Sequence, residues 1–439
     1  MFKETSKELL DFLSKSPTAF HAVENYRQIL NADGFKELLE SEHWDIVPGG
    51  KYYVTRNNTS ILAFKVGTKL DNYSFNIVTS HTDSPTFKVK ENAEIEVKNK
   101  YTQLNTEGYG GMLCATWLDR PLSIAGRVLV SEGNSIVTKL LNIDRDLLMI
   151  PNVAIHMNRA ANDGFKYNLQ VDMLPLLSAG DDRQKDIKQI IADELGVKKE
   201  DILGHDLYLY NRMAPSIWGA NEEFISSGHL DDLQCGFASL KALLAGYNDE
   251  SIDIMACFDN EEVGSGTKQG ADSTLLRDTL IRINNALGKT EEDYHRALAS
   301  SFMLSADNAH AVHPNHPEHT DVTNCTYMNE GVVVKSHAGQ KYTSDGVSMA
   351  VVKSLASGAD VPLQYFANRS DKAGGSTLGN IAMAQASMNA VDIGLPQLAM
   401  HSSYETAGIK DTYYAISLMK ALFDSHIQET STHSLEIKR

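Results

Sequence analysis

The segment 251–262, SIDIMACFDNEE, constrains the fold more than any other stretch of the chain. It is apolar as far as Phe258 and then ends abruptly in the polar sequence DNEE. A short, nearly continuous apolar run predicts a buried strand of a parallel or mixed sheet, and such strands present functional groups at their carboxyl ends. Adjacent Glu261 and Glu262 repel each other there unless a cation or a shared proton offsets their charges. A solvated acidic turn that caps a helix explains this segment equally well.

The composition is that of an ordinary globular protein, and it argues against several classes of partner. Of 439 residues, 42% are hydrophobic and 22% are charged, and a chain of this length predicts two domains. The net charge of −17, without a basic stripe, argues against nucleic acid or an anionic membrane. No apolar run approaches the roughly 18 residues of a membrane span, and the first residues lack the features of a signal peptide. Four dispersed cysteines without a CxxC pair predict reduced thiols in a cytoplasmic protein.

The spacing of apolar residues predicts an α/β fold that a β-rich segment interrupts. Helical stripes and buried strands alternate at the start of the chain and again from about residue 223, which is typical of α/β layer folds. Between these parts, short segments of alternating polarity predict strands. We therefore expect a mixed central sheet flanked by helices, formed by residues 1–88 and 223–439, with an inserted β-rich domain formed by residues 89–222.

Three finer expectations concern single segments. Residues 186–196 carry isoleucines and leucine at helical spacing and predict one helix within the insertion. The segment LMIPNVAIH, residues 148–156, is expected to be a strand. The polar residues after His426 are expected to be mobile.

Potential metal ligands follow four apolar runs and open one helix. They are His81-Thr82-Asp83, Glu261-Glu262, Asp307 and His401 after the runs, and Asp231-Asp232 at the start of the helix. Each has an ordinary structural explanation, such as a buried histidine, a helix cap or a turn. If the strands are neighbours, however, their ends gather imidazoles and carboxylates in one cleft. Such donors suit zinc, cobalt or manganese, and their number suits two ions about 3.5–4 Å apart with a bridging carboxylate.

Other histidines are weaker candidates for this site. His229 precedes a helix rather than ending a strand, so we rank it below His81. The segment HPNHPEH, residues 313–319, is dense in histidine, but its prolines and loop character favour a surface loop or a subunit contact over a metal site.

Seven segments resemble, in the same order, signature segments of the aspartyl aminopeptidase and aminopeptidase I family of dinuclear-zinc exopeptidases. They are SPTAFHAV (16–23), TSHTDSP (79–85), GYGGMLCATWLDRPLSIAGRV (108–128), GHLDDL (228–233), DNEEVGSGTKQGA (259–271), SADNAHAVHPN (305–315) and PQLAMHSSYETAG (396–408). The resemblance covers nearly the whole chain.

This resemblance implies a role for each candidate ligand. Asp231 would bridge two zinc ions, with His81 and Asp307 completing one ion and Glu262 and His401 the other. Cobalt or manganese remains an alternative at a site rich in oxygen donors.

The resemblance also implies roles for three residues that hold no ion. Glu261 would be the general base that takes a proton from the attacking water. Asp83 would hydrogen-bond His81 and fix its tautomer. The family forms dodecamers built from dimers, in which a histidine of the insertion reaches a neighbour's active site, and His156 best matches that residue.

The expected function is therefore that of a metallo-aminopeptidase, a hydrolase that removes an acidic or neutral first residue from peptides with a free N-terminus. An acidic preference needs a cation near the site, and the candidates are Lys335, Lys341, Arg369 and Lys372. Two alternatives stay open: a related dinuclear N-acyl hydrolase or carboxypeptidase, and a non-enzymatic shell protein that keeps the fold for assembly.

Overall fold

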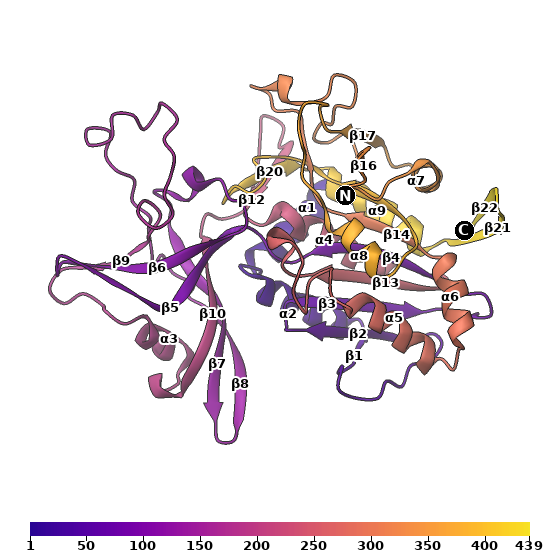
Figure 1. The fold of residues 1–439 in the computed structure, drawn as a ribbon, viewed down its shortest axis with the longest axis horizontal. Coiled ribbons are helices and arrows are strands. Elements are labelled where there is room, and N and C mark those ends of the chain that lie inside the picture. The colour runs from indigo at the N-terminus through magenta and orange to yellow at the C-terminus, as the bar shows by residue number, and fades with distance from the viewer.

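A nine-stranded mixed sheet forms the centre of the larger of two lobes (Figure 1). The computed structural model describes residues 1–439. The strands lie in the order β1 (Lys36–Glu37), β2 (Lys51–Arg56), β3 (Ser60–Val66), β13 (Ser251–Phe258), β4 (Ser74–His81), β14 (Phe302–Ala306), β18 (Asn389–Gly394), β16 (Val332–Ser336) and β17 (Leu363–Ala367). The four central strands, β13, β4, β14 and β18, run parallel to one another. The carboxyl ends of these four strands therefore meet at one edge of the sheet.

Helices cover both faces of this sheet. On one face pack α1 (Phe2–Ser14), α2 (Ala19–Ala32), α4 (Leu230–Ala245), α7 (Gly346–Gly358) and α9 (Asp411–Phe423), and on the other α5 (Leu275–Ala286), α6 (Glu291–Ala299) and α8 (Leu378–Gln385). Strand β13 shows why this needs a continuous apolar run. Met255 and Cys257 pack into the first core, whereas Ile254 and Ala256 pack into the second, because successive side chains of a strand point to opposite faces.

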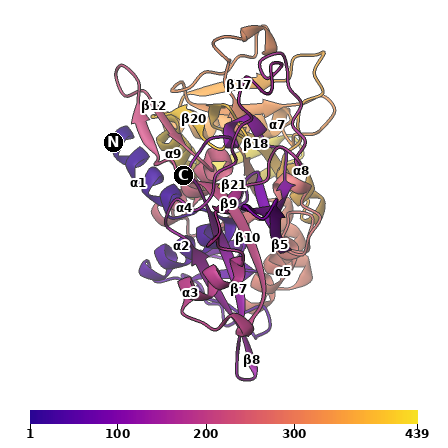
Figure 2. The ribbon, with the colours of Figure 1, turned by 90° about the vertical axis from the view of Figure 1, so that its left-hand side faces the viewer.

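A second lobe, here called the insertion lobe, is built from β5–β10. Its antiparallel strands lie in the order β8 (Ser135–Asn142), β7 (Leu122–Glu132), β10 (Ile202–Asn211), β5 (Thr86–Val97), β6 (Tyr101–Tyr109) and β9 (Leu176–Ala179). Helix α3 (Ile187–Leu195) packs on this sheet, in agreement with the helix expected near 186–196. Asp186 caps α3, and Gly196 ends it in the left-handed conformation. The insertion lobe has its own core, and Figures 1 and 2 show it on one side of the central sheet.

A small third sheet lies beside the edge where the central strands end. It contains β11 (Ser216–Trp218), β12 (Phe224–Ser227), β20 (Glu405–Gly408), β19 (Pro396–Leu398) and β15 (Ala309–His310). The chain passes through β19 between β18 and His401. His401 is thus delivered by this third sheet, and not directly by a central strand.

Two local expectations were wrong. Residues after His426 form a hairpin of β21 (His426–Ser431) and β22 (Ser434–Lys438) rather than a mobile tail, and Ile427 is buried against the core. The segment 148–156 is not a continuous strand: it makes only isolated bridges as far as Ile150 and then continues as loop. Pro151 follows immediately and has no N–H to donate to a ladder. No helix of the structure is both long enough and apolar enough to span a membrane.

Asp253, buried in the middle sheet layer, provides a stability prediction. Ser251 Oγ and Asn76 Nδ2 donate to its Oδ1 at 2.9 and 3.1 Å, while burial raises its pKa to about 8. The unfolded carboxyl loses its proton near pH 4. The stability that the protonated Asp253 carboxyl contributes is therefore fully present below about pH 4, and it is lost as the pH rises towards 8. Asp253→Asn should flatten this fall by about 1 kcal/mol per pH unit, as measured by urea unfolding at pH 5 and 7.

The exposed Asp182, replaced by Asn, is the matched control, because it removes a carboxylate of the insertion lobe that is not buried. Equal slopes of unfolding free energy against pH for wild type and Asp253→Asn would contradict the assignment.

Candidate metal centre

Four segments bring their polar residues to the carboxyl edge of the central strands. His81 is the last residue of β4, and Glu261 and Glu262 form a short turn after β13. Asp307 follows β14, which lies on the other side of β4. Asp231 sits in the first turn of α4, where its backbone departs from helical geometry. With His401, which the third sheet delivers, the structure thus brings together the five residues that the sequence nominated as ligands.

Asp231 lies at the centre of this cluster. Its Oδ1 is 3.4 Å from His81 Nε2, and its Oδ2 is 3.4 Å from His401 Nε2. A tetrahedral zinc ion with bonds of about 2.05 Å separates its ligand atoms by about 3.3 Å. One Asp231 oxygen therefore faces each imidazole at a separation that suits two ligands of one ion.

The remaining ligands divide into two sets that share Asp231. In the first set, donor atoms of His81, Asp231 and Asp307 lie within 4.8 Å of one another. In the second, donor atoms of Asp231, Glu262 and His401 do the same, and His401 Nε2 is 3.3 Å from Glu262 Oε2. This division matches the arrangement that the family resemblance implies, with Asp231 common to both ions.

Both histidines are oriented by hydrogen bonds at the nitrogen that faces away from Asp231. His81 Nδ1 lies 3.0 Å from the carbonyl oxygen of Asp83, and His401 Nδ1 lies 2.6 Å from that of Gly111. A carbonyl only accepts, so each Nδ1 donates its proton there and Nε2 is the nitrogen left for a metal. Although burial lowers the pKa of both histidines, Asp231 and the groups around it together raise it by more, so a metal ion would take the place of a proton at each Nε2. Gly111 follows β6, so the insertion lobe orients one of the ligands.

Asp83 holds the two glutamates through their backbone. Its Oδ1 accepts the N–H of Glu261 at 3.2 Å, and its Oδ2 accepts the N–H of Glu262 at 3.1 Å. The Tyr109 hydroxyl of the insertion lobe also donates to Oδ2, at 2.6 Å. His81 Nδ1 is closer to the main-chain oxygen of Asp83, at 3.0 Å, than to the carboxylate Oδ1 of Asp83, at 3.4 Å. Asp83 therefore positions the backbones of Glu261 and Glu262 as much as it orients His81.

Two other carboxylates hold backbone N–H groups of the candidate ligands: Glu405, which sequence reasoning missed, and Asp232, which it named beside Asp231 without a separate role. Glu405 Oε2 accepts the N–H of Asp231 at 3.0 Å, and its Oε1 accepts the N–H of His401 at 2.8 Å. Asp232 Oδ2 accepts the N–H of His81 at 3.1 Å. Glu405 lies within PQLAMHSSYETAG, a segment that the sequence singled out without giving this residue a role.

The electrostatics of the cluster call for cations. Burial raises the pKa of Glu261 to about 7, and burial with the charge of Asp231 raises that of Glu405 to about 8. Burial also raises the pKa of Glu262. Asp231 Oδ1 and Glu262 Oε1 are buried without a hydrogen-bond partner. Buried, unpaired carboxylate oxygens beside two imidazoles whose Nε2 atoms face Asp231 fit divalent ions, and zinc accepts this donor set.

Lys335 is the one candidate specificity cation that contacts this cluster. It is buried on β16, donates to the carbonyl oxygen of Asn308 at 2.8 Å, and lies 3.8 Å from Asp307 Oδ2. Burial alone would lower its pKa, but Asp307 raises it, so the ammonium stays charged. Arg369 pairs instead with Asp371, and Lys372 is exposed. Lys341 donates to carbonyls of a neighbouring loop.

Two histidines considered earlier lie outside the ligand sets. His229 is half-buried beside the start of α4 and belongs to neither set. His156 is exposed in the loop that precedes β9 and makes no hydrogen bond or ion pair with the ligands of its own chain. Its expected action on a neighbouring subunit stays a prediction.

Replacing Glu405 provides a test of backbone positioning. Glu405→Gln keeps the shape but turns one acceptor into an N–H donor that faces a backbone N–H. We expect zinc affinity to fall about 10- to 100-fold, as for other residues that orient ligands. Competition with a chromophoric chelator measures this affinity. Glu200→Gln, at an exposed position of the insertion lobe, is the control, and unchanged affinity in Glu405→Gln would refute the positioning role.

Comparisons with known proteins agree along the whole chain. A family model described as Aminopeptidase I zinc metalloprotease (M18) matches residues 12–423. The protein named Probable M18 family aminopeptidase 2 from Clostridium novyi (strain NT) is 48% identical over 425 residues, covering 95% of this chain and 98% of that one. Its namesake from Stutzerimonas stutzeri (strain A1501) is 39% identical over 431 residues, covering 97% and 99%.

Solved structures share the fold. The cryo-EM structure of the Ape4 and Nbr1 complex contains a chain with a TM-score of 0.92 and 35% identity, covering 96% of this chain and 86% of that one. The S. cerevesiae mApe1 dodecamer has a TM-score of 0.84 and 28% identity, covering 96% and 97%.

Proposed function

The chain belongs to the M18 family of aminopeptidase I zinc metalloproteases, and from this premise we propose a two-ion mechanism for it. As a member of that family, it is a metal-dependent aminopeptidase, a hydrolase that acts on peptide N-termini. The proposal concerns which residues hold the ions and which residue moves the proton. The observation that carries it is Asp231, whose two oxygens each face the Nε2 atom of a different histidine at 3.4 Å.

In this proposal His81, Asp231 and Asp307 hold one zinc ion, and Asp231, Glu262 and His401 hold the other. When bound, two such ions lower the pKa of water and polarise the scissile carbonyl. Cobalt or manganese also suits these donors. Lys335 contributes to balancing the carboxylates, but only the ions bring enough positive charge to the buried oxygens of Asp231 and Glu262.

Glu261 is the proposed general base. It belongs to neither set that contains Asp231, although one of its oxygens lies within 4.8 Å of donor atoms of His81 and Glu262, and its side chain makes no hydrogen bond within the chain. Its pKa near 7, raised by burial, places proton uptake and release in the neutral range. Glu261 takes a proton from the attacking water and passes it to the leaving amine. Asp83 supports this transfer because it fixes the backbone N–H of Glu261.

The free N-terminus of the peptide is proposed to sit against the ions and neighbouring carboxylates, which restricts cleavage to the first residue. Lys335 is the only one of the four candidate cations in contact with a ligand, and it is already paired with Asp307. Both an acidic and a neutral first residue therefore remain in the proposed substrate range.

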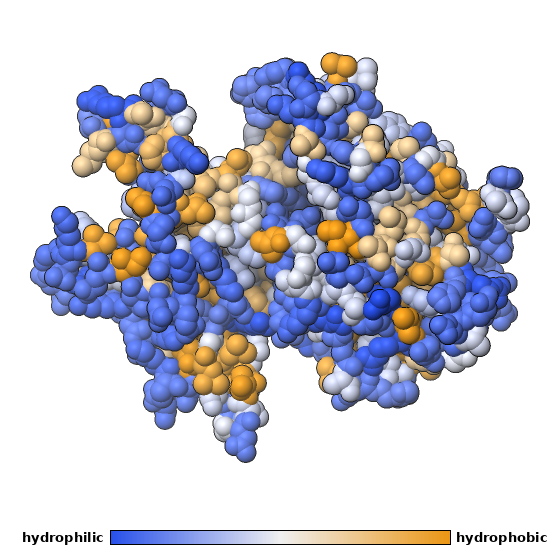
Figure 3. All heavy atoms as spheres, viewed as in Figure 1, coloured by the Kyte–Doolittle hydropathy of each residue, from blue (hydrophilic) through white to orange (hydrophobic).

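Assembly into a homo-oligomer, and specifically a dodecamer built from dimers, is also proposed. The mApe1 dodecamer is similar over nearly the whole chain. Figure 3 shows apolar side chains on the surface of the insertion lobe, where Ile136, Met157 and Val171 are 68–82% exposed. His156, in the same loop as Met157, would reach the active site of a partner subunit and help to stabilise the oxyanion. The four cysteines are free thiols, in keeping with the proposed cytoplasmic location.

A substrate panel measured across a zinc titration tests the proposed function. Apoprotein is titrated with zinc while the hydrolysis of aspartyl, glutamyl, leucyl and alanyl amides is measured, together with the N-acetylated form of each. Activity should rise until about two ions per chain are bound, and the acetylated compounds should resist cleavage. Equal rates for free and acetylated substrates would contradict the proposed role of the free N-terminus, and full activity with one ion would contradict the two-ion site.

A further inference from the structure

The histidine-rich segment 313–319 forms an ordered turn between β15 and β16. A short 3-10 turn spans Pro317–His319, and the N–H of His319 donates to the carbonyl oxygen of His316 at 3.2 Å. Pro317 restricts φ at the first position of the turn. Arg369 donates to the carbonyl oxygen of Glu318 and joins the turn to the segment after β17. The backbone that carries the side chains of the turn is thus restricted to few conformations.

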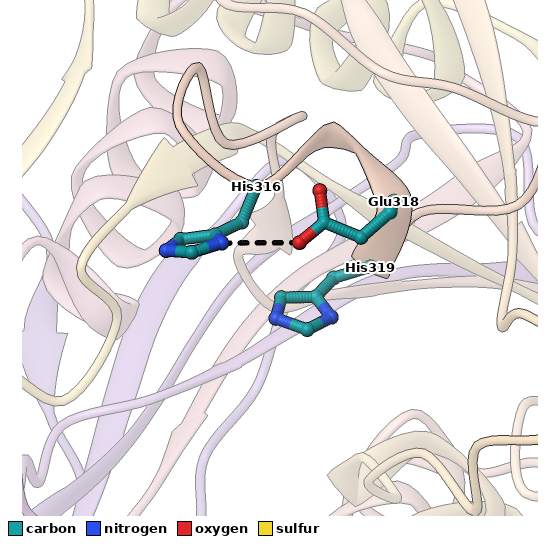
Figure 4. Close-up of side chains that lie close together, drawn as sticks. All are labelled: His316, Glu318 and His319. Atoms are coloured by element: carbon teal, nitrogen blue, oxygen red, sulfur yellow. Dashed lines mark hydrogen bonds and ion pairs between the residues drawn. The ribbon is translucent and has the colours of Figure 1, made fainter.

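Three side chains of this turn converge in solvent (Figure 4). His316 Nδ1 lies 3.0 Å from Glu318 Oε1, and the rings of His316 and His319 stack with centroids 5.4 Å apart. One donor atom from each of the three residues lies within 4.8 Å of the other two. The ring of His313 lies 5.4 Å from that of His316, so a further imidazole stands beside the cluster.

This arrangement differs from an ordinary surface ion pair. His295 and Glu291 on α6 approach each other at 3.9 Å with both side chains exposed, but no second imidazole joins them. At the turn, two imidazoles and one carboxylate offer three donors of the kind that zinc and its neighbours prefer. Because the side chains are exposed, they rotate freely enough to shorten the donor separations, and water completes the coordination.

The turn shares no ligand with the reaction site. Asp231, Glu262 and their partners lie at the edge of the central strands, whereas His316, Glu318 and His319 form a separate group of potential donors. We propose that these three residues bind a divalent transition-metal ion of the zinc, cobalt, nickel and copper group, in addition to the ions of the reaction site. This site does not depend on the mechanism proposed above.

Zinc stoichiometry of the full chain tests the proposal. Equilibrium dialysis against buffered free zinc, with metal content measured by mass spectrometry, should give about three ions per wild-type chain. The double variant His316→Ala with His319→Ala should bind one ion fewer and keep the wild-type rate of substrate hydrolysis. Asp231→Asn, which disables the reaction site, should retain the ion of the turn. His295→Ala is the matched control and should bind as many ions as wild type.

Two results would overturn the proposal: equal zinc content in wild type and the double variant, or loss of the additional ion in His295→Ala. Glu318→Gln provides a milder change at an exposed position. It should weaken binding of the additional ion about tenfold, because a neutral amide replaces a carboxylate ligand. A Glu318→Gln protein that bound this ion as tightly as wild type would exclude Glu318 as a ligand. If the two-ion mechanism is wrong, Asp231→Asn will keep its reaction-site ions instead of losing them. The difference in zinc content between wild type and the double variant will then still be one ion, so the two proposals can fail separately.

Discussion

Replacing Glu261 with Gln will lower kcat by about 10²- to 10⁴-fold and leave the zinc content unchanged. Glutamine has nearly the same shape as glutamate but cannot accept a proton at neutral pH. Glu261 belongs to neither ligand set that contains Asp231, although it also groups with His81 and Glu262. Because the two proposed sets are complete without it, its loss should not release an ion. Steady-state kinetics with the best substrate of the panel, together with metal analysis of the same sample, measure both quantities.

Glu262→Gln is the matched control, because it makes the same chemical change one residue away. Glu262 Oε2 lies 3.3 Å from His401 Nε2, so this variant should lose zinc as well as activity. A Glu261→Gln protein with more than about a tenth of the wild-type kcat would exclude Glu261 as the general base. Loss of zinc from Glu261→Gln would instead indicate that it is a ligand.

Replacing Asp231 with Asn should have the largest effect on metal binding. Asparagine keeps one oxygen but presents an NH₂ group to the other histidine, and the bridging charge is lost. We expect the zinc content of the reaction site to fall from about two ions to fewer than one per chain, with no measurable hydrolysis. Metal analysis after gel filtration measures the content.

A chelator distinguishes this result from simple misfolding. Ions that bind only the folded protein stabilise it by about 3–4 kcal/mol at 100 to 1,000 times their Kd. A chelator should therefore lower the thermal midpoint of wild type clearly and that of Asp231→Asn only slightly. The exposed Asp182→Asn variant should behave like wild type. An Asp231→Asn protein with two tightly held ions would refute the bridging role.

The strand that ends in DNEE illustrates which features the local pattern of apolar residues predicts. Apart from Asp253, residues 252–258 are apolar on both faces because β13 is covered by helices on both sides, and this burial is visible as an apolar run. The expected helix near 186–196 was found for a similar reason, since its apolar stripe packs on the insertion sheet. The hairpin after His426 was missed because its strands are short and mostly exposed.

Hydrogen bonds between residues far apart in the chain are not visible as a pattern in the sequence. Glu405 accepts backbone N–H groups of Asp231 and His401, and Gly111 accepts from His401 across 290 residues of sequence. A backbone N–H or carbonyl takes part in a hydrogen bond whatever side chain its residue carries. Nothing in the sequence around Asp231 or His401 therefore indicates which carboxylate or carbonyl will hold it.

The sequence by itself determined the alternation of elements, the family and the types of donor that follow the buried strands, because burial and ligand chemistry both restrict residue type. Only the tertiary structure decided that β13, β4, β14 and β18 are consecutive parallel neighbours. It also decided that one Asp231 oxygen faces each histidine, and that the insertion lobe contributes Tyr109 and Gly111 to the same site. These relations depend on strand order and on the docking of two lobes, which are set by long-range packing.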